Sequence, residues 1–375
     1  MMRITGSLFN FMPALQCAAP ILFLAGRENH LGEISDSWAH DYFAGKIVFS
    51  PYTVRSFLLE ERGLVVNILV TGGAGFIGSH LVRAWKARGA RVRVLDNFRT
   101  GKRSNLDGVD VDIIEGSVTD AEAVRAGMRG VQVVHHLAAL VSVPESVEKP
   151  IECENINVIG TILLLEEAIR QGVKAFVFSS SSAVYGNVDR PLHSETDLPA
   201  PASPYAISKL AGEHYLHLAQ GANGLRTVSL RYFNVFGPRQ DPTSPYAAAV
   251  SIFFARAIAG RPLTIFGDGN QTRDFIYASD VVEANLLAAE RGEGVYNVAA
   301  GRRITINDLA QTIKLIAQSS SPLEYAEERA GDVRHSRGNI ERLSALGWKP
   351  RVSLEEGLRE TYLWMKNQNE VNKHA

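Results

Sequence analysis

The sequence has little cysteine. Only Cys17 and Cys153 occur among 375 residues. Two thiols cannot build a disulfide framework or a structural zinc site. Such cysteine usage is typical of a reducing compartment, so we expect a cytoplasmic location.

The sequence also lacks long apolar runs and an excess of one charge. No run of about 18 apolar residues occurs, so we expect no membrane span. The formal net charge of −1 gives no electrostatic footprint for nucleic acid. With 46% hydrophobic and 21% charged residues, the composition is typical of a globular protein, and the length predicts roughly two domains.

Residues 1–65 differ from the rest of the chain because they show no regular periodicity. A short apolar stretch at 14–24 is interrupted by Gln16 and Pro20, and no clear signal-peptide cleavage site follows. We interpret residues 1–65 as an atypical extension, either disordered or the product of a misassigned start. We expect the functional chain to begin at Val66.

From Val65 onward, short β-branched runs alternate with stretches of helical periodicity. This alternation predicts an α/β fold with a doubly wound, parallel Rossmann sheet over residues 66–240. The expected strands are 65–70, 92–95, 111–114, 131–135, 175–178 and 225–230, and the expected helices are 76–88, 159–171 and 204–218.

After residue 240 the alternation loosens, which indicates a smaller C-terminal α/β region over 241–375 that shares some sheet elements. Helices are expected at 247–259 and 280–290. A third follows Ile304, with Asn307 as a possible cap.

A glycine-rich loop joins the first expected strand to the first helix. Its glycines, Gly72, Gly75 and Gly78, have the spacing GxxGxxG. Glycines allow a tight turn and a close approach of a pyrophosphate, and the helix N-terminus offers N–H groups and a positive dipole end. The context of strand, loop and helix predicts a dinucleotide site.

Asp96 ends the second expected strand, 18 residues after Gly78. A carboxylate there can accept hydrogen bonds from the adenosine ribose and repels a 2′-phosphate, so it favours NAD over NADP. Arg99, Lys102 and Arg103 could attract such a phosphate. We interpret them as solvated loop charges and predict NAD.

Hydroxyl side chains and a Tyr-Lys pair suggest a catalytic site. The fifth expected strand runs into four serines, Ser179 to Ser182, at the sheet edge where ligands bind in such folds. Tyr205 and Lys209 lie four residues apart and share a helix face. That spacing is common by chance, but here it follows a dinucleotide loop. A nearby ammonium and the positive nicotinamide ring favour the phenolate, and lowering a pKa from about 10 by about 3 units requires roughly 4 kcal/mol.

Several further segments occur in order along the chain: His136-Leu137-Ala138-Ala139, Asn157 to Thr161, Arg231 to Gln240, Gln271 to Tyr277 and Gly331 to Ser336. With the glycine loop and the Ser, Tyr and Lys residues, they resemble the extended short-chain dehydrogenase/reductase family, specifically its nucleotide-sugar epimerases. The resemblance covers Val66 to about Trp364.

The resemblance implies an NAD-dependent UDP-sugar 4-epimerase in which Ser181, Tyr205 and Lys209 are catalytic. Ser181 would hold the sugar O4 and Tyr205 would be the base. The implied NAD-binding residues are Gly72, Gly75, Phe76, Ile77, Gly78, Asp96, Asn97, Phe98, Arg99, Thr100, Gly101, Ser117, Val118, Leu137, Ala138, Ala139, Asn157, Ser179, Tyr205, Lys209 and Phe233. The implied substrate-binding residues are Ser142, Ser181, Tyr205, Asn234, Phe266, Arg273, Arg329, Asp332 and Ser336.

Two positions depart from the family pattern. Ser117 stands where the family usually has an aspartate that contacts adenine, so that carboxylate contact is lost. Ser336 stands where glucose-type epimerases often have a bulky aromatic residue. The small side chain leaves room for an acetamido group, and residues 140–144 also look like the N-acetylhexosamine-accepting subgroup. We therefore expect UDP-GlcNAc/UDP-GalNAc, UDP-Glc/UDP-Gal, or both as substrates.

Two other functions stay open. A nucleotide-sugar 4,6-dehydratase or decarboxylase would carry an acidic residue just after the strand-five serine, where this chain has Ser182 and Ala183. A non-catalytic NAD-binding scaffold would often lose the tyrosine or the lysine. The family resemblance also implies a homodimer formed by helices over 155–171 and 205–220.

Overall fold

The computed structural model describes residues 65–188, 190–242, 249–328 and 333–374. These residues belong to one compact unit. The predicted extension over 1–65 lies outside the described residues, apart from Val65 itself.

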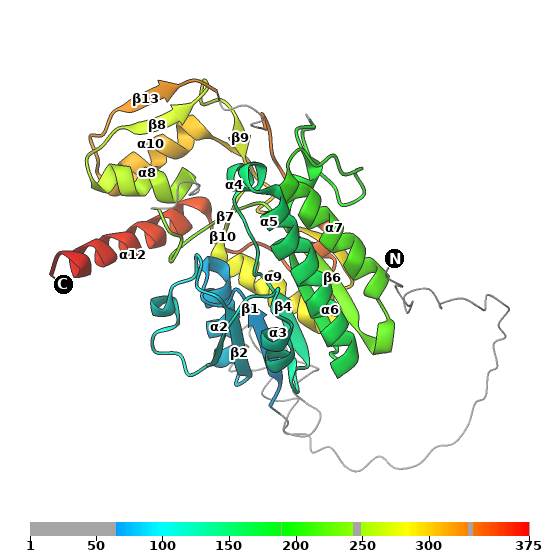
Figure 1. Ribbon diagram of the computed structural model, residues 1–375. Helices are drawn as coiled ribbons and strands as arrows, with labels where there is room; N and C mark the ends of the chain where they lie inside the picture. Colours follow the sequence, from blue (N-terminus) through cyan, green and yellow to red (C-terminus); the bar gives the residue numbers. More distant parts are fainter. Residues whose placement is uncertain (1–64, 189, 243–248, 329–332, 375) are drawn as a thin grey trace, which may run out of the picture. The chain divides into compact units, whose positions relative to one another are not determined.

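The described residues form a central seven-stranded parallel sheet with the order β11-β6-β5-β4-β1-β2-β3 (Figure 1). It confirms the predicted α/β Rossmann fold. Six strands coincide with predicted ones to within a few residues. The strands are β1 (Asn67–Thr71), β2 (Arg91–Asp96), β3 (Asp112–Glu115), β4 (Val133–His136), β5 (Ala175–Ser181), β6 (Arg226–Tyr232) and β11 (Gly294–Val298).

Helices cover both faces of this sheet (Figure 1). On one face, α2 (Phe76–Ala87) and α9 (Ala278–Arg291) contribute to a buried apolar cluster with the sheet. On the other face, a second cluster involves α3 (Ala121–Met128), α6 (Gly160–Gln171) and α7 (Pro204–Ala219). Both faces of the parallel strands are thus buried, which explains their nearly continuous apolar sequence.

A third apolar cluster lies in the C-terminal part of the chain. It joins α8 (Ala249–Ile258), α10 (Ile306–Ala317) and α12 (Leu354–His374) to the parallel pair β8 (Leu263–Phe266) and β13 (Leu323–Ala326). Shorter pairs link β7 (Asn234–Phe236) with β10 (Phe275–Tyr277), and β9 (Thr272–Arg273) with β12 (Ile304–Thr305).

Short helices and turns complete the described chain. Their bounds are α4 (Val143–Glu148), α5 (Pro150–Glu154), the π-helical turn η2 (Asn155–Ile159), α11 (Glu341–Ser344), and the 3-10 turns η1 (Arg103–Leu106), η3 (Ser182–Tyr185) and η4 (Ala222–Gly224). None of the described helices is long and apolar enough to cross a membrane.

One local expectation was wrong. The cap of α10 is Thr305, whose hydroxyl accepts from the Asp308 N–H at 3.0 Å, whereas Asn307 donates to the Asp268 carbonyl. Strand β5 ends at Ser181, three residues beyond Phe178, because residues 179–181 pair with β6, in agreement with the expectation that serines end this strand. The Ser180 hydroxyl donates to the Glu213 carboxylate.

Candidate active site

The carboxyl ends of the central strands bring most of the predicted residues to one edge of the sheet. The strand order reverses between β1 and β4, and such a switch point opens a crevice for ligands. Around it lie the glycine loop after β1, Asp96 at the end of β2, the loop after β4 and Ser181 at the end of β5.

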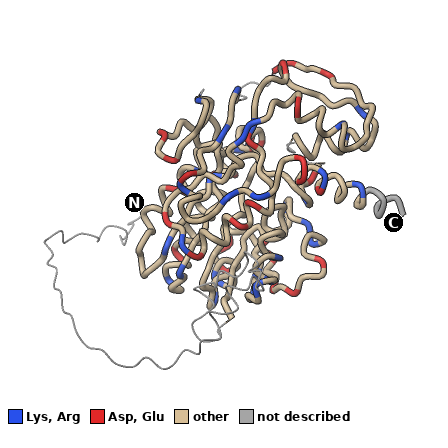
Figure 2. The backbone as a smooth tube through the Cα atoms, turned by 180° about the vertical axis from the view of Figure 1, so that it is seen from behind, with Lys and Arg blue, Asp and Glu red and all other residues tan. Residues whose placement is uncertain are grey.

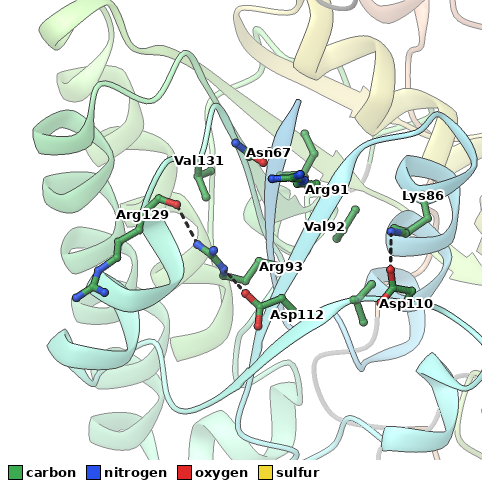
Figure 3. Close-up of a pocket in the computed structure, with 11 residues that line it drawn as sticks. Asn67, Lys86, Arg91, Val92, Arg93, Asp110, Asp112, Arg129 and Val131 are labelled. Atoms are coloured by element: carbon green, nitrogen blue, oxygen red, sulfur yellow. Dashed lines mark hydrogen bonds and ion pairs between the residues drawn. The ribbon is translucent and has the colours of Figure 1, made fainter. Parts of the chain in front are cut away.

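A pocket of about 480 Å³ lies at the opposite, amino edge of the sheet and contains none of the predicted site residues (Figure 3). Its lining includes Asn67 and Arg91 at the starts of β1 and β2. The Arg93 guanidinium there already donates to Asp112 and to three backbone carbonyls. The candidate site is therefore the crevice at the carboxyl edge.

The glycine loop has the shape that a dinucleotide pyrophosphate requires. A Cβ added at Gly72, where φ is +68°, would lie 2.8 Å from the Ala138 nitrogen. A Cβ at Gly78 would lie 2.2 Å from the Gly72 carbonyl oxygen. No described side chain caps α2, whose first turn includes Phe76 and Ile77 and contains no acidic residue. Its N-terminal N–H groups and positive dipole end can therefore take an anionic phosphate, so the residues present fit NAD.

Asp96 lies where the ribose site was predicted. Its carboxylate accepts the N–H groups of Ala74 and Phe98 at 2.9 and 2.8 Å. Burial raises the pKa of Asp96, and these two hydrogen bonds oppose that shift. A Cβ at Gly101 would lie 3.0 Å from both carboxylate oxygens, so the loop through Thr100 and Gly101 passes closely over Asp96.

A cavity of about 490 Å³ opens beside this loop. It brings together the predicted residues Asn97, Arg99 and Ser117 from the ends of two strands. The Ser117 hydroxyl lies 2.7 Å from the Thr119 hydroxyl and also accepts the Thr119 N–H. The other wall comes from α5 and η2, with Glu152, Asn155, Ile156 and Ile159.

The loop after β4 is fastened to the glycine loop and to η2. The backbone N–H groups of Leu137 and Ala138 donate to the Thr71 carbonyl and hydroxyl, at 3.1 and 3.2 Å. Asn157 accepts the Leu140 N–H at 2.7 Å and donates to the Leu140 carbonyl. Its buried side chain therefore sets the course of residues 137–140, the predicted NAD-channel loop that includes Ala139.

The predicted catalytic residues lie on two adjacent elements, since α7 packs against β5. Ser181 is the last residue of β5, and Tyr205 and Lys209 lie on α7, which Ser203 caps. Lys209 is buried, and its ammonium donates to the Ser179 carbonyl at 2.8 Å. It lies 5.8 Å from the centre of the Tyr205 ring.

The pKa shifts of Tyr205 and Lys209 differ from expectation. Burial raises the pKa of Tyr205, opposite to the predicted direction, and a hydrogen bond with Ser181 acts against that rise. Burial lowers the pKa of Lys209 to about 8. The protein residues alone therefore favour the neutral phenol. The phenolate expected from the sequence therefore requires further positive charge near Tyr205.

Helix α4 contributes a contact that the sequence did not reveal. The hydroxyl of Ser146 accepts the Tyr205 N–H at 3.1 Å and donates to the Val143 carbonyl. The first turn of α7 is thus held by α4 through the backbone of Tyr205. Ser142, a predicted substrate residue, caps α4 by accepting the Glu145 N–H.

The remaining predicted NAD-binding residues Val118 and Phe233 are buried. Val118 lies against Gly160, where an added Cβ would come within 2.6 Å of its side chain. Phe233 follows β6 and packs against Tyr185. The hydroxyl of Ser179, also predicted to bind NAD, lies 3.0 Å from the Tyr232 hydroxyl.

The predicted substrate residues Asn234, Arg273 and Ser336 lie on neighbouring segments. Asn234 on β7 donates through its side chain to the Asp274 carbonyl at 3.1 Å. Arg273 lies on β9, and the Ser336 N–H donates to the carbonyl of its neighbour Thr272. Phe266 ends β8. Arg329 and Asp332 lie outside the described residues.

Asp274 is a buried residue of this region that the sequence analysis missed. Its carboxylate accepts the N–H groups of Ala300, Gly301 and Gly338 at 2.8, 3.1 and 3.2 Å. It thereby ties two loops, one of them bearing Ser336, to the strand that precedes it. Burial raises the pKa of Asp274 to about 6, against these hydrogen bonds.

Among the described residues, no group of three or more His, Cys, Asp or Glu side chains could hold a metal ion. The site combines three parts: a nucleotide-binding edge of the sheet, the Ser181, Tyr205 and Lys209 group, and a neighbouring polar region. These features define a dinucleotide-dependent α/β enzyme.

The chain belongs to the NAD dependent epimerase/dehydratase family, whose model matches residues 68–299. It is 38% identical over 304 residues to a putative UDP-glucose 4-epimerase of Methanocaldococcus jannaschii, covering 80% of this chain and 99% of the relative. A UDP-N-acetyl-alpha-D-glucosaminuronate decarboxylase of Bacillus cytotoxicus is 35% identical over 316 residues, covering 80% of this chain and 97% of the relative.

Solved structures agree with this assignment. The UDP-glucose 4-epimerase of Thermotoga maritima with UDP-glucose superposes with a TM-score of 0.78 at 42% identity, covering 81% of this chain and all of that one. A UDP-N-acetylglucosamine 4-epimerase of Methanobrevibacter ruminantium, in complex with UDP-N-acetylmuramic acid, gives 0.78 at 41% identity, covering 81% and 99%. The predicted family and its NAD dependence are confirmed.

Proposed function

We propose that the protein catalyses the NAD-dependent 4-epimerisation of a UDP-sugar. The observation that carries this proposal is the position of Ser181, Tyr205 and Lys209 at the same sheet edge as the glycine loop. Similarity to UDP-glucose and UDP-N-acetylglucosamine 4-epimerases supports it. In this proposal residues 66–240 bind NAD and residues 241–375 bind the nucleotide sugar.

In the proposed reaction Tyr205, Ser181 and Lys209 have different roles. NAD held by the glycine loop and Asp96 would supply the hydride acceptor for C4 of the sugar and the hydride donor for the opposite face. The Tyr205 phenolate takes the proton of the C4 hydroxyl and later returns it. Ser181 holds O4 through a hydrogen bond, while buried Lys209 provides a positive charge near Tyr205 and can donate to the nicotinamide ribose.

The substrate side requires groups that hold a diphosphate and a uracil. We assign Asn234 and Arg273 to the pyrophosphate, since a guanidinium binds phosphate oxygens in a bidentate manner. Phe266 offers an aromatic face to the uracil. Arg329 and Asp332 stay predicted contributors. The small Ser336 leaves room for a C2 acetamido group, so N-acetylated UDP-sugars and UDP-glucose or UDP-galactose both belong to the proposal.

Epimerisation is favoured over dehydration or decarboxylation by the residues that follow Ser181. Ser182 and Ala183 begin the turn η3, and neither can abstract a proton as an acidic residue could. The presence of Tyr205 and buried Lys209 together beside Ser181 also favours a catalytic protein over a scaffold.

One assay tests the reaction. The purified protein is incubated with UDP-galactose, UDP-GalNAc, UDP-glucuronate or dTDP-glucose without added NAD, and products are separated by chromatography. We expect the C4 epimer of at least one UDP-sugar, because the cofactor is regenerated in each cycle. Absence of any C4 epimer, also after addition of NAD, would refute the proposal, and a 4-keto-6-deoxy product would identify a dehydratase.

We further propose a homodimer in a cytoplasmic location, formed through the helices over 155–171 and 205–220. Helix α7 exposes Ile207, Tyr215 and Leu218, with Leu218 77% exposed. Their spacing of 8 and 3 residues puts them on one side of the helix. Ile151 on α5, which packs beside α7 (Figure 1), is also 77% exposed. Covering these side chains removes apolar surface from water.

The variant Tyr215→Glu/Leu218→Glu is expected to be monomeric, because it would bury two charges in the proposed interface. Light scattering coupled to gel filtration measures the mass. Leu315→Glu on α10 is the matched control, since Leu315 is 78% exposed, and it should keep the wild-type mass. A monomeric wild type, or a dimeric double variant, would contradict the proposed interface.

A further inference from the structure

Arg99, Lys102 and Arg103 follow strand β2, which ends at Asp96. Each of these three cations pairs with a carboxylate from another part of the chain. Arg99 forms two ion pairs at once. One guanidinium nitrogen lies 2.7 Å from Glu145 on α4, and another lies 2.8 Å from Glu152 on α5. Both terminal guanidinium nitrogens of Arg99 are therefore already paired with a carboxylate.

The other two cations are engaged in a similar way. The Lys102 ammonium lies 2.7 Å from the Asp241 carboxylate. Arg103 pairs with Glu115, and its guanidinium stacks 4.2 Å from the centre of the Phe98 ring. A loop that looks basic in the sequence thus presents few unpaired positive charges.

The Arg99 pairs lie at the rim of the cofactor crevice. Arg99 and Glu152 both line the cavity of about 490 Å³ that also contains Asn97 and Ser117. Because Arg99 comes from the loop after β2 and Glu152 from α5, their ion pair joins two walls of this cavity. Asp96, the residue expected to face the ribose hydroxyls, is only three positions before Arg99.

The carboxylates of this loop and of its ion-pair partners outnumber the cations by one. Two carboxylates share Arg99, and Lys149 lies 3.5 Å from Glu145 and 4.0 Å from Glu152. Basic and acidic positions are interspersed along the described chain (Figure 2). Four cations, Arg99, Lys102, Arg103 and Lys149, face five carboxylates, Asp96, Glu115, Glu145, Glu152 and Asp241. A doubly charged 2′-phosphate would therefore meet no unpaired cation among these four described residues.

We propose that Glu145 and Glu152 are specificity-determining residues for the cofactor, because they withhold Arg99 from a 2′-phosphate and so exclude NADP. Dinucleotide folds that accept NADP use an arginine near this position to bind the phosphate. Here the arginine is present, and two acidic residues about 50 positions downstream occupy it. The inference rests on the NAD dependence of the family and needs no assumption about the sugar.

The test uses the variant Glu145→Gln/Glu152→Gln, which keeps side-chain size and removes both charges. The protein is equilibrated with equal NAD and NADP and separated from free nucleotide by gel filtration. Bound nucleotides are then released by acid and quantified by ion-exchange chromatography. We expect the bound NADP:NAD ratio to rise about tenfold, since a charged hydrogen bond to the 2′-phosphate becomes available. Asp96 is unchanged, so NAD stays preferred.

Two further variants isolate the role of Arg99. Glu148→Gln, an exposed acid on the same helix α4, should leave the ratio at the wild-type value. Adding Arg99→Gln to the double variant should return the ratio to that value, because the freed cation is gone. An unchanged ratio in the double variant, a gain that survives Arg99→Gln, or an equal loss of both nucleotides would each overturn the proposal. No sugar nucleotide is present, so failure of the proposed epimerase activity would not affect the outcome.

Discussion

Replacing Tyr205 by phenylalanine is expected to reduce the rate of UDP-sugar epimerisation by about 10³-fold, within the range for loss of a general acid or base. The ring stays in place, and the backbone N–H of residue 205 still donates to Ser146. Only the hydroxyl that takes the C4 proton is removed. Initial rates of C4 epimer formation, measured at saturating UDP-sugar, give the effect on kcat.

The same variant should keep its cofactor, because the glycine loop and Asp96 are untouched. NAD content after acid release is therefore expected to match the wild type. Tyr215→Phe, on the same helix but 40% exposed, is the control and should retain full activity. Wild-type turnover by Tyr205→Phe would show that Tyr205 is not the base and that another group near Ser181 takes the C4 proton.

The parts of the site that the sequence predicted are those fixed by local chemistry. The turn at Gly72 has a positive φ and a close backbone neighbour, which a glycine accommodates, so the glycine itself indicates the turn. Asp96 is the last residue of a strand, and Tyr205 and Lys209 share a helix face through their spacing. Each of these features depends on fewer than ten consecutive residues, which a single sequence can display.

The parts that the sequence missed depend on partners distant along the chain. Asp274 and Asp268 look alike in sequence, yet Asp274 is buried and accepts three N–H groups while Asp268 pairs with exposed Arg334. Ser146 acts on Tyr205 from 59 residues away. Strand β11 was also missed, because buried Asn297 interrupts its apolar pattern and finds a partner through the fold, in the Tyr185 hydroxyl. Burial and pairing of this kind arise from the tertiary fold.

The sequence also failed to predict the direction of the Tyr205 pKa shift, which depends on the tertiary fold. The spacing of Tyr205 and Lys209 correctly predicted that they share a helix face, but not where the ammonium points. Lys209 donates to the Ser179 carbonyl and lies above the Phe178 ring at 4.9 Å. Burial, which the helix pattern could not quantify, lowers the pKa of Lys209 and raises that of Tyr205.

Lys209→Met is expected to lower turnover by at least about 10²-fold, because the positive charge that favours the Tyr205 phenolate is lost. The same change should remove a pH dependence of stability. The pKa of Lys209 is about 8 in the folded protein and 10.5 in its unperturbed state. Between these values the unfolded chain holds a proton that the folded chain has released, so stability rises with pH there, by about 3 kcal/mol in all. Below about pH 8 both states are protonated, and the full cost of burying the ammonium persists.

At pH 7 the methionine variant should therefore be at least as stable as the wild type, since the loss of the hydrogen bond to Ser179 costs about 1–3 kcal/mol. At pH 10.5, where burial of the neutral amine carries no such cost, the wild type should be the more stable protein. Urea unfolding across this pH range measures the difference in unfolding free energy, and exposed Lys149→Met serves as the control for a lost charge. Parallel stability curves for wild type and Lys209→Met would show that the pKa of Lys209 is the same in the folded and the unfolded protein. If the variant is inactive and its curve of unfolding free energy against pH crosses that of the wild type, Lys209 serves catalysis at the expense of stability.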